Sequence, residues 1–325
     1  MTLYLLLDFG GTKHSAAVWR PGETGWVAHE RLFSPPDADA DYDWQTMMAL
    51  GRKLLNGRQP AAIGVSFGGP VDFARGMVRL SHHVPGWADF PLQQKLEETF
   101  DAPAVVDNDA NVAGLGEYQF GAGQGCHSLL YVTVSTGVGG GWVLNGRPWR
   151  GWQGLAGEIG HTMVDAQGPL CLCGKRGCVE RLASGPYMAA DYAAARPDLS
   201  TAVTGQTVAE LAAQGDPLAR QLLQRGAQAL GLGLGNAANL LNPQRVILGG
   251  GVTKAGELWW QTVRQTVQQL LLPEIEVEIS PAALGDDAPL WGAAALAAQL
   301  LGGETGWDRD RSGEADLATP GRTLN

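Results

Sequence analysis

The chain opens with Leu3-Tyr4-Leu5-Leu6-Leu7-Asp8-Phe9-Gly10-Gly11-Thr12-Lys13, an apolar run that ends in an acid and a glycine turn. A second apolar run, Ser15 to Trp19, follows before Pro21-Gly22. Two such runs separated by glycines predict a β-hairpin. Asp8, at the end of a buried strand, could hold a hard cation beside a phosphate, although a plain turn-former is the alternative. Thr12 and Lys13 next to it favour the phosphate interpretation.

The second half of the chain repeats this pattern. Ser128 to Val134 predicts a strand, Ser135 to Gly141 a glycine-rich turn, and Trp142 to Leu144 the returning strand. Around the two hairpins, apolar residues at helical spacing alternate with short strands up to about Leu301. The alternation indicates an α/β fold, in which sites gather at the carboxyl ends of the strands.

Three glycine turns each follow an apolar strand: Gly10-Gly11-Thr12, Thr136-Gly137-Val138-Gly139-Gly140 and Gly249-Gly250-Gly251. There, backbone N–H groups can converge on an anion without hindrance from a Cβ atom. Taken alone, each is more often an ordinary tight turn. The chain has no Walker sequence, and Trp142 stands where the dinucleotide fingerprint needs its third glycine. A nucleotide site would therefore be neither a P-loop nor a Rossmann site.

Asp109 lies in the polar cluster Asp107-Asn108-Asp109-Ala110-Asn111, after the strand Ala104 to Val106. Near a helix N-terminus its carboxylate is expected to stay ionised around neutral pH, because the helix dipole favours the charge. It could then accept the proton of a bound hydroxyl while the Asn108 amide holds another hydroxyl. Local sequence alone favours the alternative that Asp109 is the N-cap of the helix.

One histidine and three cysteines have the spacing of a metal site: His161, Cys171, Cys173 and Cys178. An imidazole and three thiolates fill a tetrahedral zinc shell, so the ion would be structural. A set of buried free thiols is the alternative. Glu158 and Glu180 flank the cluster, and zinc would hold both carboxylates and the imidazole near one point. Such groups bind vicinal hydroxyls, which indicates a polyol or sugar ligand.

Composition and charge narrow the class of protein. The chain has 325 residues, of which 45% are hydrophobic and 17% charged, enough for two domains. Its net charge of −10 and the lack of a basic run speak against nucleic acid or an anionic membrane as partner. The apolar start is too short for a signal peptide or spanning helix, so we expect a cytoplasmic protein. From residue 302 to 325 the chain is polar and is expected to be a disordered tail.

Taken in order, these segments resemble the ROK family, which groups bacterial sugar kinases with related transcriptional repressors. The match runs from about residue 3 to about residue 300, and the cysteine motif with its trailing Glu180 is its most specific part. The matching segments are Asp8-Phe9-Gly10-Gly11-Thr12-Lys13, Phe67-Gly68-Gly69-Pro70-Val71-Asp72, Asp107-Asn108-Asp109-Ala110-Asn111, Ser135-Thr136-Gly137-Val138-Gly139-Gly140-Gly141, Gly157-Glu158-Ile159-Gly160-His161 and Cys171-Leu172-Cys173-Gly174-Lys175-Arg176-Gly177-Cys178-Val179-Glu180.

The resemblance implies the actin-like (ribonuclease H-like) two-lobed ATPase and sugar kinase fold. It places an N-terminal lobe over 1–115, joined by a helix over 288–301, and a C-terminal lobe with the zinc motif over 116–287. It implies phosphorylation of a hexose by MgATP, with Asp109 as general base and a structural Zn²⁺. The hexose would be held by Gly69, Asn108, Asp109, Glu158, His161 and Glu180. Zinc would be bound by His161, Cys171, Cys173 and Cys178. MgATP would be bound by Asp8, Gly10, Gly11, Thr12, Lys13, Thr136, Gly137, Gly249, Gly250 and Gly251.

Departures from the family pattern bear on the substrate. His83 stands where glucokinases of the family commonly have Asn, which questions the sugar more than the kinase. Trp142, Trp149 and Trp152 replace smaller residues, and core or dimer surface is a more plausible role for them than a sugar platform. Glucose is the first expectation, while fructose, mannose, allose and N-acetylmannosamine stay open. The resemblance also implies a homodimer.

Parts of the sequence also fit three other classes of protein. A repressor of this family would need a DNA-binding segment ahead of Asp8, where only seven residues stand. A hydrolase is suggested by Gly64-Val65-Ser66-Phe67-Gly68, which fits the nucleophile elbow, yet Gly69-Pro70 follows where a helix is required. A sugar-binding protein without catalysis is the third alternative.

Overall fold

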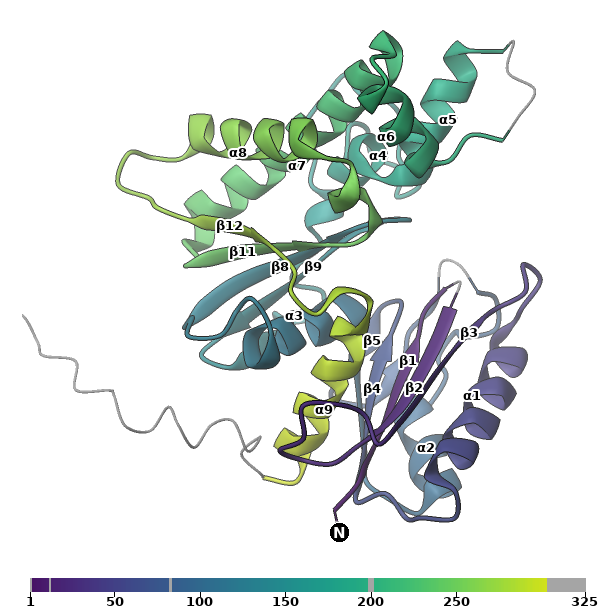
Figure 1. Ribbon diagram of the computed structural model, residues 1–325. Coiled ribbons are helices and arrows are strands. Elements are labelled where there is room, and N and C mark those ends of the chain that lie inside the picture. Colours follow the sequence, from purple (N-terminus) through teal and green to yellow (C-terminus); the bar gives the residue numbers. More distant parts are fainter. Residues whose placement is uncertain (1, 12, 82–83, 198–201, 303–325) are drawn as a thin grey trace, which may run out of the picture.

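The computed structural model describes residues 2–11, 13–81, 84–197 and 202–302. Thr12, His83 and the tail beyond residue 302, for which the sequence made predictions, lie outside the described residues. The chain forms two lobes, each built on a five-stranded sheet (Figure 1). Within the described ranges, no helix is long and apolar enough to cross a membrane.

The sheet of the N-terminal lobe confirms the predicted hairpin. Strand β1 is antiparallel to β2 and parallel to β4, which in turn is parallel to β7. The strand order is β3 (Ala28–Phe33), β2 (Lys13–Trp19), β1 (Tyr4–Phe9), β4 (Ala62–Phe67) and β7 (Ala104–Asn108). Strand β3 was not predicted, because it is a half-exposed edge strand without an apolar run. A small two-stranded sheet follows β4 and consists of β5 (Val71–Asp72) and β6 (Met77–Val78).

Helices α1 (Ala40–Leu55) and α2 (Leu92–Phe100) cover the outer face of this sheet. Each buries the apolar stripe that the sequence shows, such as Met47 and Leu50 in α1 and Leu96 in α2. The stripes pack with the strands into one apolar cluster. Burial of these side chains is the main stabilising contribution to the lobe.

The C-terminal lobe confirms the second predicted hairpin, because β8 and β9 are antiparallel, and its sheet repeats the strand order of the first. The order is β10 (Arg147–Trp149), β9 (Val138–Leu144), β8 (Ser128–Val134), β11 (Arg245–Gly249) and β12 (Glu278–Pro281). Its outer layer consists of α4 (Val179–Ala183), α5 (Gly185–Ala195), α6 (Gly205–Ala213), α7 (Pro217–Leu241) and α8 (Glu257–Leu270).

One predicted turn is shorter than the sequence suggested. Gly139, Gly140 and Gly141 belong to strand β9 and not to the turn, which is confined to residues 135–137. Gly140 and Gly141 are needed for close packing, since a Cβ atom would lie 2.6 Å from the carbonyl oxygen of Gly157 at the first and 2.4 Å from that of Ala110 at the second. From sequence alone, a glycine that permits close approach looks the same as one that permits a turn.

Helices α3 (Asp109–Phe120) and α9 (Ala288–Leu300) lie between the two sheets (Figure 1). Helix α3 packs on the C-terminal sheet, whereas α9 packs on β1 and β4 of the N-terminal sheet. The helices cross closely, since a Cβ atom on Gly292 would lie 1.7 Å from the carbonyl oxygen of Val112. We propose the lobe limits 1–115 with 288–301, and 116–287. The packing of α9 on the N-terminal sheet supports the first, while α3 spans the boundary.

Glu117 connects the end of α3 to the segment between β12 and α9. Its fully buried carboxylate accepts backbone N–H groups of Ala122 and Ala283 at Oε2 and of Leu284 at Oε1, at 2.8, 3.1 and 2.8 Å. Glu117→Gln would turn an amide N–H₂ toward at least one of these donors. We expect a loss of about 2–3 kcal/mol in the free energy of unfolding, measured by urea denaturation. The exposed Glu274→Gln is the control, and equal stability of the two variants would contradict the role.

Candidate active site

The carboxyl ends of three parallel strands bring polar side chains into one row. Asp8 on β1 is in register with Ser66 on β4, which is in register with Asp107 on β7. All three are buried, and Ser66 Oγ donates to Asp8 Oδ1 at 2.8 Å. Ser66 lies inside a strand that leads to another strand, so the hydrolase interpretation of its motif is wrong. The motif gave no sign that the serine is a partner of Asp8.

Asn108, and not Asp109, caps helix α3. Its Oδ1 accepts the backbone N–H groups of Ala110 and Asn111 at 3.0 and 3.4 Å. Its Nδ2 donates to the carbonyl oxygen of Gly69 at 3.1 Å and to Asp109 Oδ1 at 2.9 Å. The N-cap alternative for Asp109 is therefore wrong by one residue. Asp109 is the first helical residue, and its two hydrogen bonds with described residues both end on Oδ1.

The charge on Asp109 differs from the sequence expectation of a firmly ionised carboxylate. Burial, followed by the negative charges of Asp8 and Glu158, raises its pKa to about 7, although the bonds from Ala110 and Asn108 oppose the rise. Burial likewise raises the pKa of Asp8 to about 6, against the bond from Ser66. The lowering of the Asp109 pKa by the helix N-terminus is thus smaller than the rise caused by burial and by the neighbouring acids. A side chain that is partly accessible and titrates near neutrality suits proton transfer.

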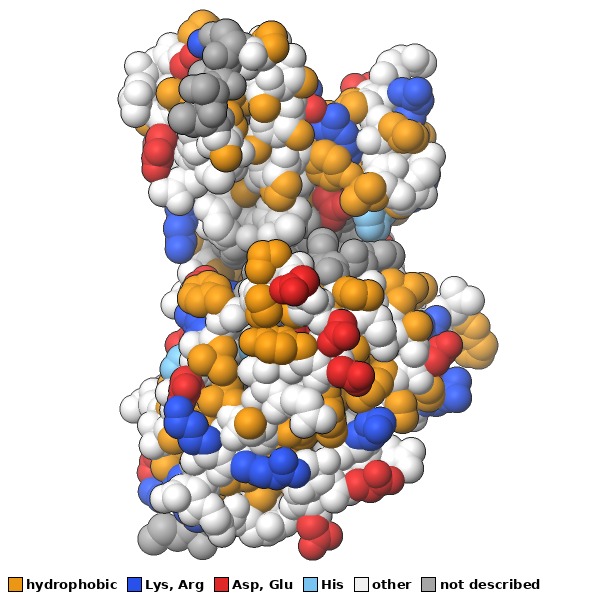
Figure 2. All heavy atoms as spheres, turned by 90° about the vertical axis from the view of Figure 1, so that its right-hand side faces the viewer, with side chains coloured by type: hydrophobic (Ala, Val, Ile, Leu, Met, Phe, Trp, Pro, Cys, Tyr) orange, Lys and Arg blue, Asp and Glu red, His pale blue; other side chains and the backbone are white. Residues whose placement is uncertain are grey.

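The two glutamates come from the C-terminal lobe. Glu158 is exposed and precedes the short 3₁₀ helix Ile159–His161. Glu180 Oε2 accepts the backbone N–H of Val138 at 3.0 Å, and a Cβ atom on Gly137 would lie 2.7 Å from the same oxygen. Glu180 is therefore tied to the second glycine turn. Figure 2 shows acidic and histidine side chains at the waist between the lobes.

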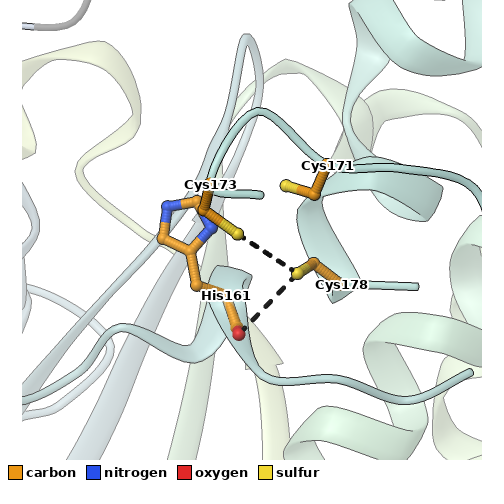
Figure 3. A group of neighbouring side chains, drawn as sticks. All are labelled: His161, Cys171, Cys173 and Cys178. Carbon is orange, nitrogen blue, oxygen red and sulfur yellow. Dashed lines mark hydrogen bonds between the residues drawn. The ribbon is translucent and has the colours of Figure 1, made fainter. Parts of the chain in front are cut away.

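The predicted metal ligands converge. Their ligand atoms, one each from His161, Cys171, Cys173 and Cys178, lie within 4.8 Å of one another (Figure 3). All three cysteines are free thiols, and His161 Nδ1 is buried without a hydrogen-bond partner. An orphaned imidazole nitrogen beside three sulfurs fits the donor set of a closed, tetrahedral zinc site.

A large cavity of about 1010 Å³ opens beside the second and third glycine turns. It is lined by Ser135, Thr136, Gly185 and Gly251, and by apolar residues of α5 and α6. Gly249 and Gly250 lie behind the wall, packed against Tyr131 and Val134. The first turn belongs to the other lobe: Gly10 closes it through a bond to the Lys13 carbonyl oxygen, and Lys13 Nζ lies 3.1 Å from Asp286 Oδ2.

The structure shows where the three tryptophans lie and adds a residue that sequence reasoning missed. Trp142 is buried in the core of the C-terminal lobe, whereas Trp149 is 44% and Trp152 100% exposed. Arg150 pairs with Asp107 at 2.7 Å. Asp107 belongs to the polar cluster 107–111 that the sequence indicated. Nothing in the sequence around Arg150, however, marks Arg150 as the partner of Asp107.

A family model described as "ROK family" matches residues 4–300. The chain belongs to the ROK family. It is 38% identical to a glucokinase of Halalkalibacterium halodurans over 258 residues, which are 73% of this chain and 76% of the relative. It is 37% identical to an N-acetylmannosamine kinase of Yersinia pseudotuberculosis over 302 residues, which are 91% of this chain and 99% of the relative.

Among solved structures, a ROK family glucokinase of Streptomyces griseus in complex with glucose and AMPPNP superimposes with a TM-score of 0.79. It is 34% identical and the match covers 91% of this chain and 99% of that chain. The actin-like fold implied by the resemblance is thereby confirmed for this ROK protein.

Proposed function

We propose that this ROK protein transfers the γ-phosphoryl group of MgATP to a hexose, with glucose as the first candidate and glucose 6-phosphate as the product. The observation that carries the proposal is the carboxylate of Asp109, which is partly accessible at the start of α3, accepts a hydrogen bond from Asn108, and has a pKa that burial raises to about 7. The named glucokinase relatives support glucose, and the N-acetylmannosamine kinase relative keeps that sugar as the alternative.

Asp109 acts as the general base. Its carboxylate accepts the proton of the sugar hydroxyl while that oxygen forms a bond to the γ-phosphorus, and the bond between this phosphorus and the bridging oxygen breaks as ADP leaves. Asn108, Gly69, Glu158, His161 and Glu180 hold the remaining hydroxyls. Because such a reaction depends mostly on positioning and charge neutralisation, we expect closure of the lobes to exclude water.

MgATP spans the two lobes. The cavity beside Thr136 and Gly251 has the volume and apolar lining for the adenosine, and the turn at Gly137 leads from it toward Glu180. Asp8 faces the same strand edge as Asp109, which suits a carboxylate that binds the substrate Mg²⁺ directly or through water. Gly10, Gly11, Thr12 and Lys13 would approach the phosphates from the N-terminal lobe. Lys13 would then exchange Asp286 for phosphate.

Zinc at His161, Cys171, Cys173 and Cys178 would supply no catalytic step, because four protein ligands leave no open position. Its contribution is to fix the loop that carries these residues. The ring nitrogen of His161 that does not bind metal can then donate to the sugar, and Glu180 follows Cys178 closely in the chain.

The test is ADP release with MgATP against glucose, fructose, mannose, allose, N-acetylglucosamine and N-acetylmannosamine. We expect turnover with glucose at least ten times higher in kcat/KM than with the others. Turnover with N-acetylmannosamine instead would keep the kinase and change its substrate. Silence across the panel, from protein shown to contain zinc, would favour the sugar-binding protein without catalysis.

A homodimer in the cytoplasm is proposed as the working state. Exposed apolar side chains occur along the loops that flank the metal site, among them Trp152, Leu170 and Leu172. A contiguous patch of such side chains would mark a contact surface. The free thiols are consistent with a reducing compartment. Sedimentation velocity measures the state, and a single species of the chain mass, 34.3 kDa, at micromolar concentration would contradict the dimer.

A further inference from the structure

Arg150 extends from the C-terminal lobe onto the strand end that carries Asp109. It follows β10, the edge strand of the C-terminal sheet, and its Nε and Nη2 donate to Asp107 Oδ2 at 2.8 and 2.7 Å. The side chain of Asp107 is only 3% exposed and that of Arg150 20%. Because solvent has little access to these two charge-assisted hydrogen bonds, they fix the relative positions of the side chains far better than a surface ion pair does.

Asp107 in turn organises the segment that contains the base. Its Oδ1 accepts the backbone N–H of Asn108 at 2.8 Å and the side-chain amide of Asn111 at 3.2 Å. Asn108 then caps α3 and donates to Asp109. A displacement of the Asp107 carboxylate would therefore be transmitted to the base through one intervening residue.

Arg150 also packs on a second part of the N-terminal lobe. The central guanidinium carbon lies 3.4 Å from the centroid of the Phe73 ring, in the connection between β5 and β6. From the same region, Arg79 Nη2 donates to the carbonyl oxygen of Gln153 at 3.2 Å. The loop that begins at Arg150 is thus attached to the opposite lobe at several points, through an ion pair, a cation–π contact and a hydrogen bond.

The far end of this loop leads into Glu158. The Ala156 N–H donates to the carbonyl oxygen of Arg150 at 2.9 Å, which closes the loop on itself. Gly157 is then packed against β9, since a Cβ atom on it would lie 2.3 Å from the carbonyl oxygen of Gly140. Glu158 follows directly and is close enough to raise the pKa of Asp109. One end of this short loop, Arg150, therefore bonds to Asp107 beside the base, and the other end leads into Glu158, whose charge acts on the base.

We propose that Arg150 is a positioning residue for phosphoryl transfer, which aligns Asp109 and Glu158 across the two lobes by anchoring the loop 150–157 to Asp107 and Phe73. The inference rests on the proposed function. Arg150 acts through Asp107 and not on the reacting atoms. Because misplacement of a reacting group by about 1 Å can cost on the order of 10²-fold in rate, the effect should appear in kcat.

The test compares Arg150→Met, Arg150→Lys and the matched control Arg147→Met, an exposed arginine on the same edge strand. With hexose and MgATP varied separately, we expect Arg150→Met to lower kcat about 30- to 100-fold and to raise the KM for the hexose. The KM for ATP should stay within twofold. Arg150→Lys keeps the charge but cannot donate from two nitrogens to Asp107. Its kcat should therefore lie between that of wild type and that of Arg150→Met. Arg147→Met should match wild type.

The outcomes separate this inference from the proposed function. A wild-type protein that phosphorylates no sugar overturns the function and this role with it. Wild-type turnover together with Arg150→Met within twofold of it overturns the role of Arg150 alone. An Arg150→Met variant with unchanged kcat, in which the KM for the hexose and the KM for ATP rise equally, would likewise overturn it. Should Arg150→Met fail to fold, Arg150→Lys decides, because wild-type kcat in that variant excludes the positioning role.

Discussion

Asp109→Asn should lower kcat for the hexose by about 10³- to 10⁴-fold while the sugar still binds. An amide has nearly the shape of the carboxylate and still accepts the bonds from Asn108 and Ala110, but it cannot take the hydroxyl proton. The measurement combines single-turnover kinetics with calorimetric titration of the sugar. Unchanged turnover would show that another group is the base.

The same carboxylate makes turnover and stability depend on pH in opposite directions. With a pKa of about 7, Asp109 becomes a competent base only as the pH rises, so wild-type kcat/KM should increase from pH 5 and level off above about 8. In the unfolded chain the carboxyl has its ordinary pKa of 3.8, so between pH 4 and 7 the folded state binds more protons. The contribution of Asp109 to the unfolding free energy therefore falls as the pH rises through this window.

Asp109→Asn lacks this penalty and should be the more stable protein at pH 8. The interval between 3.8 and about 7 sets an upper limit of about 4 kcal/mol, which solvent around the partly accessible side chain reduces. The gain should shrink toward zero at pH 4. Melting scans at both pH values test it, with the exposed Asp37→Asn as control. A gain that is equal at pH 4 and pH 8 would contradict the raised pKa.

Local patterns predicted what local physics determines. The apolar runs of β1 and β8, each ended by glycine, were enough for both hairpins, and the cysteine spacing was enough for the cluster around His161. Two glycine roles were confused, because Gly141 permits the approach of α3 and not a turn. Whether a glycine serves a turn or a contact is decided by a neighbour that is distant in sequence.

The site was predictable where residues share a motif and not where they meet across the lobes. The association of Asp107, Asn108 and Asp109 could be predicted without knowledge of the fold, because the three residues are consecutive in the chain. Which of them caps α3, and what burial does to the pKa of Asp109, depend on the other strands. The ion pair between Asp107 and Arg150 joins residues 43 positions apart on different lobes, and no spacing rule links them.

Cys173→Ser should lower thermal stability and raise the KM for the hexose together. Structural zinc sites contribute about 10–16 kcal/mol of binding free energy in isolated peptides, so even partial loss would exceed most single substitutions. For a chain of this size we expect the melting temperature to fall by roughly 10 °C. Without the ion His161 loses the anchor at its buried nitrogen, and its ring no longer faces the sugar in one orientation.

Gln167→Ala is the matched control, since Gln167 is exposed in the segment between His161 and Cys171 and binds no metal in the proposed site. Zinc content by atomic absorption should be one per chain in wild type and in this control, and close to zero in Cys173→Ser. The ATP KM should change little, because the cavity proposed for the adenosine is lined by α5 and α6 and not by the cysteine loop. A zinc-free variant with wild-type melting temperature and sugar KM would separate the metal from both folding and substrate binding.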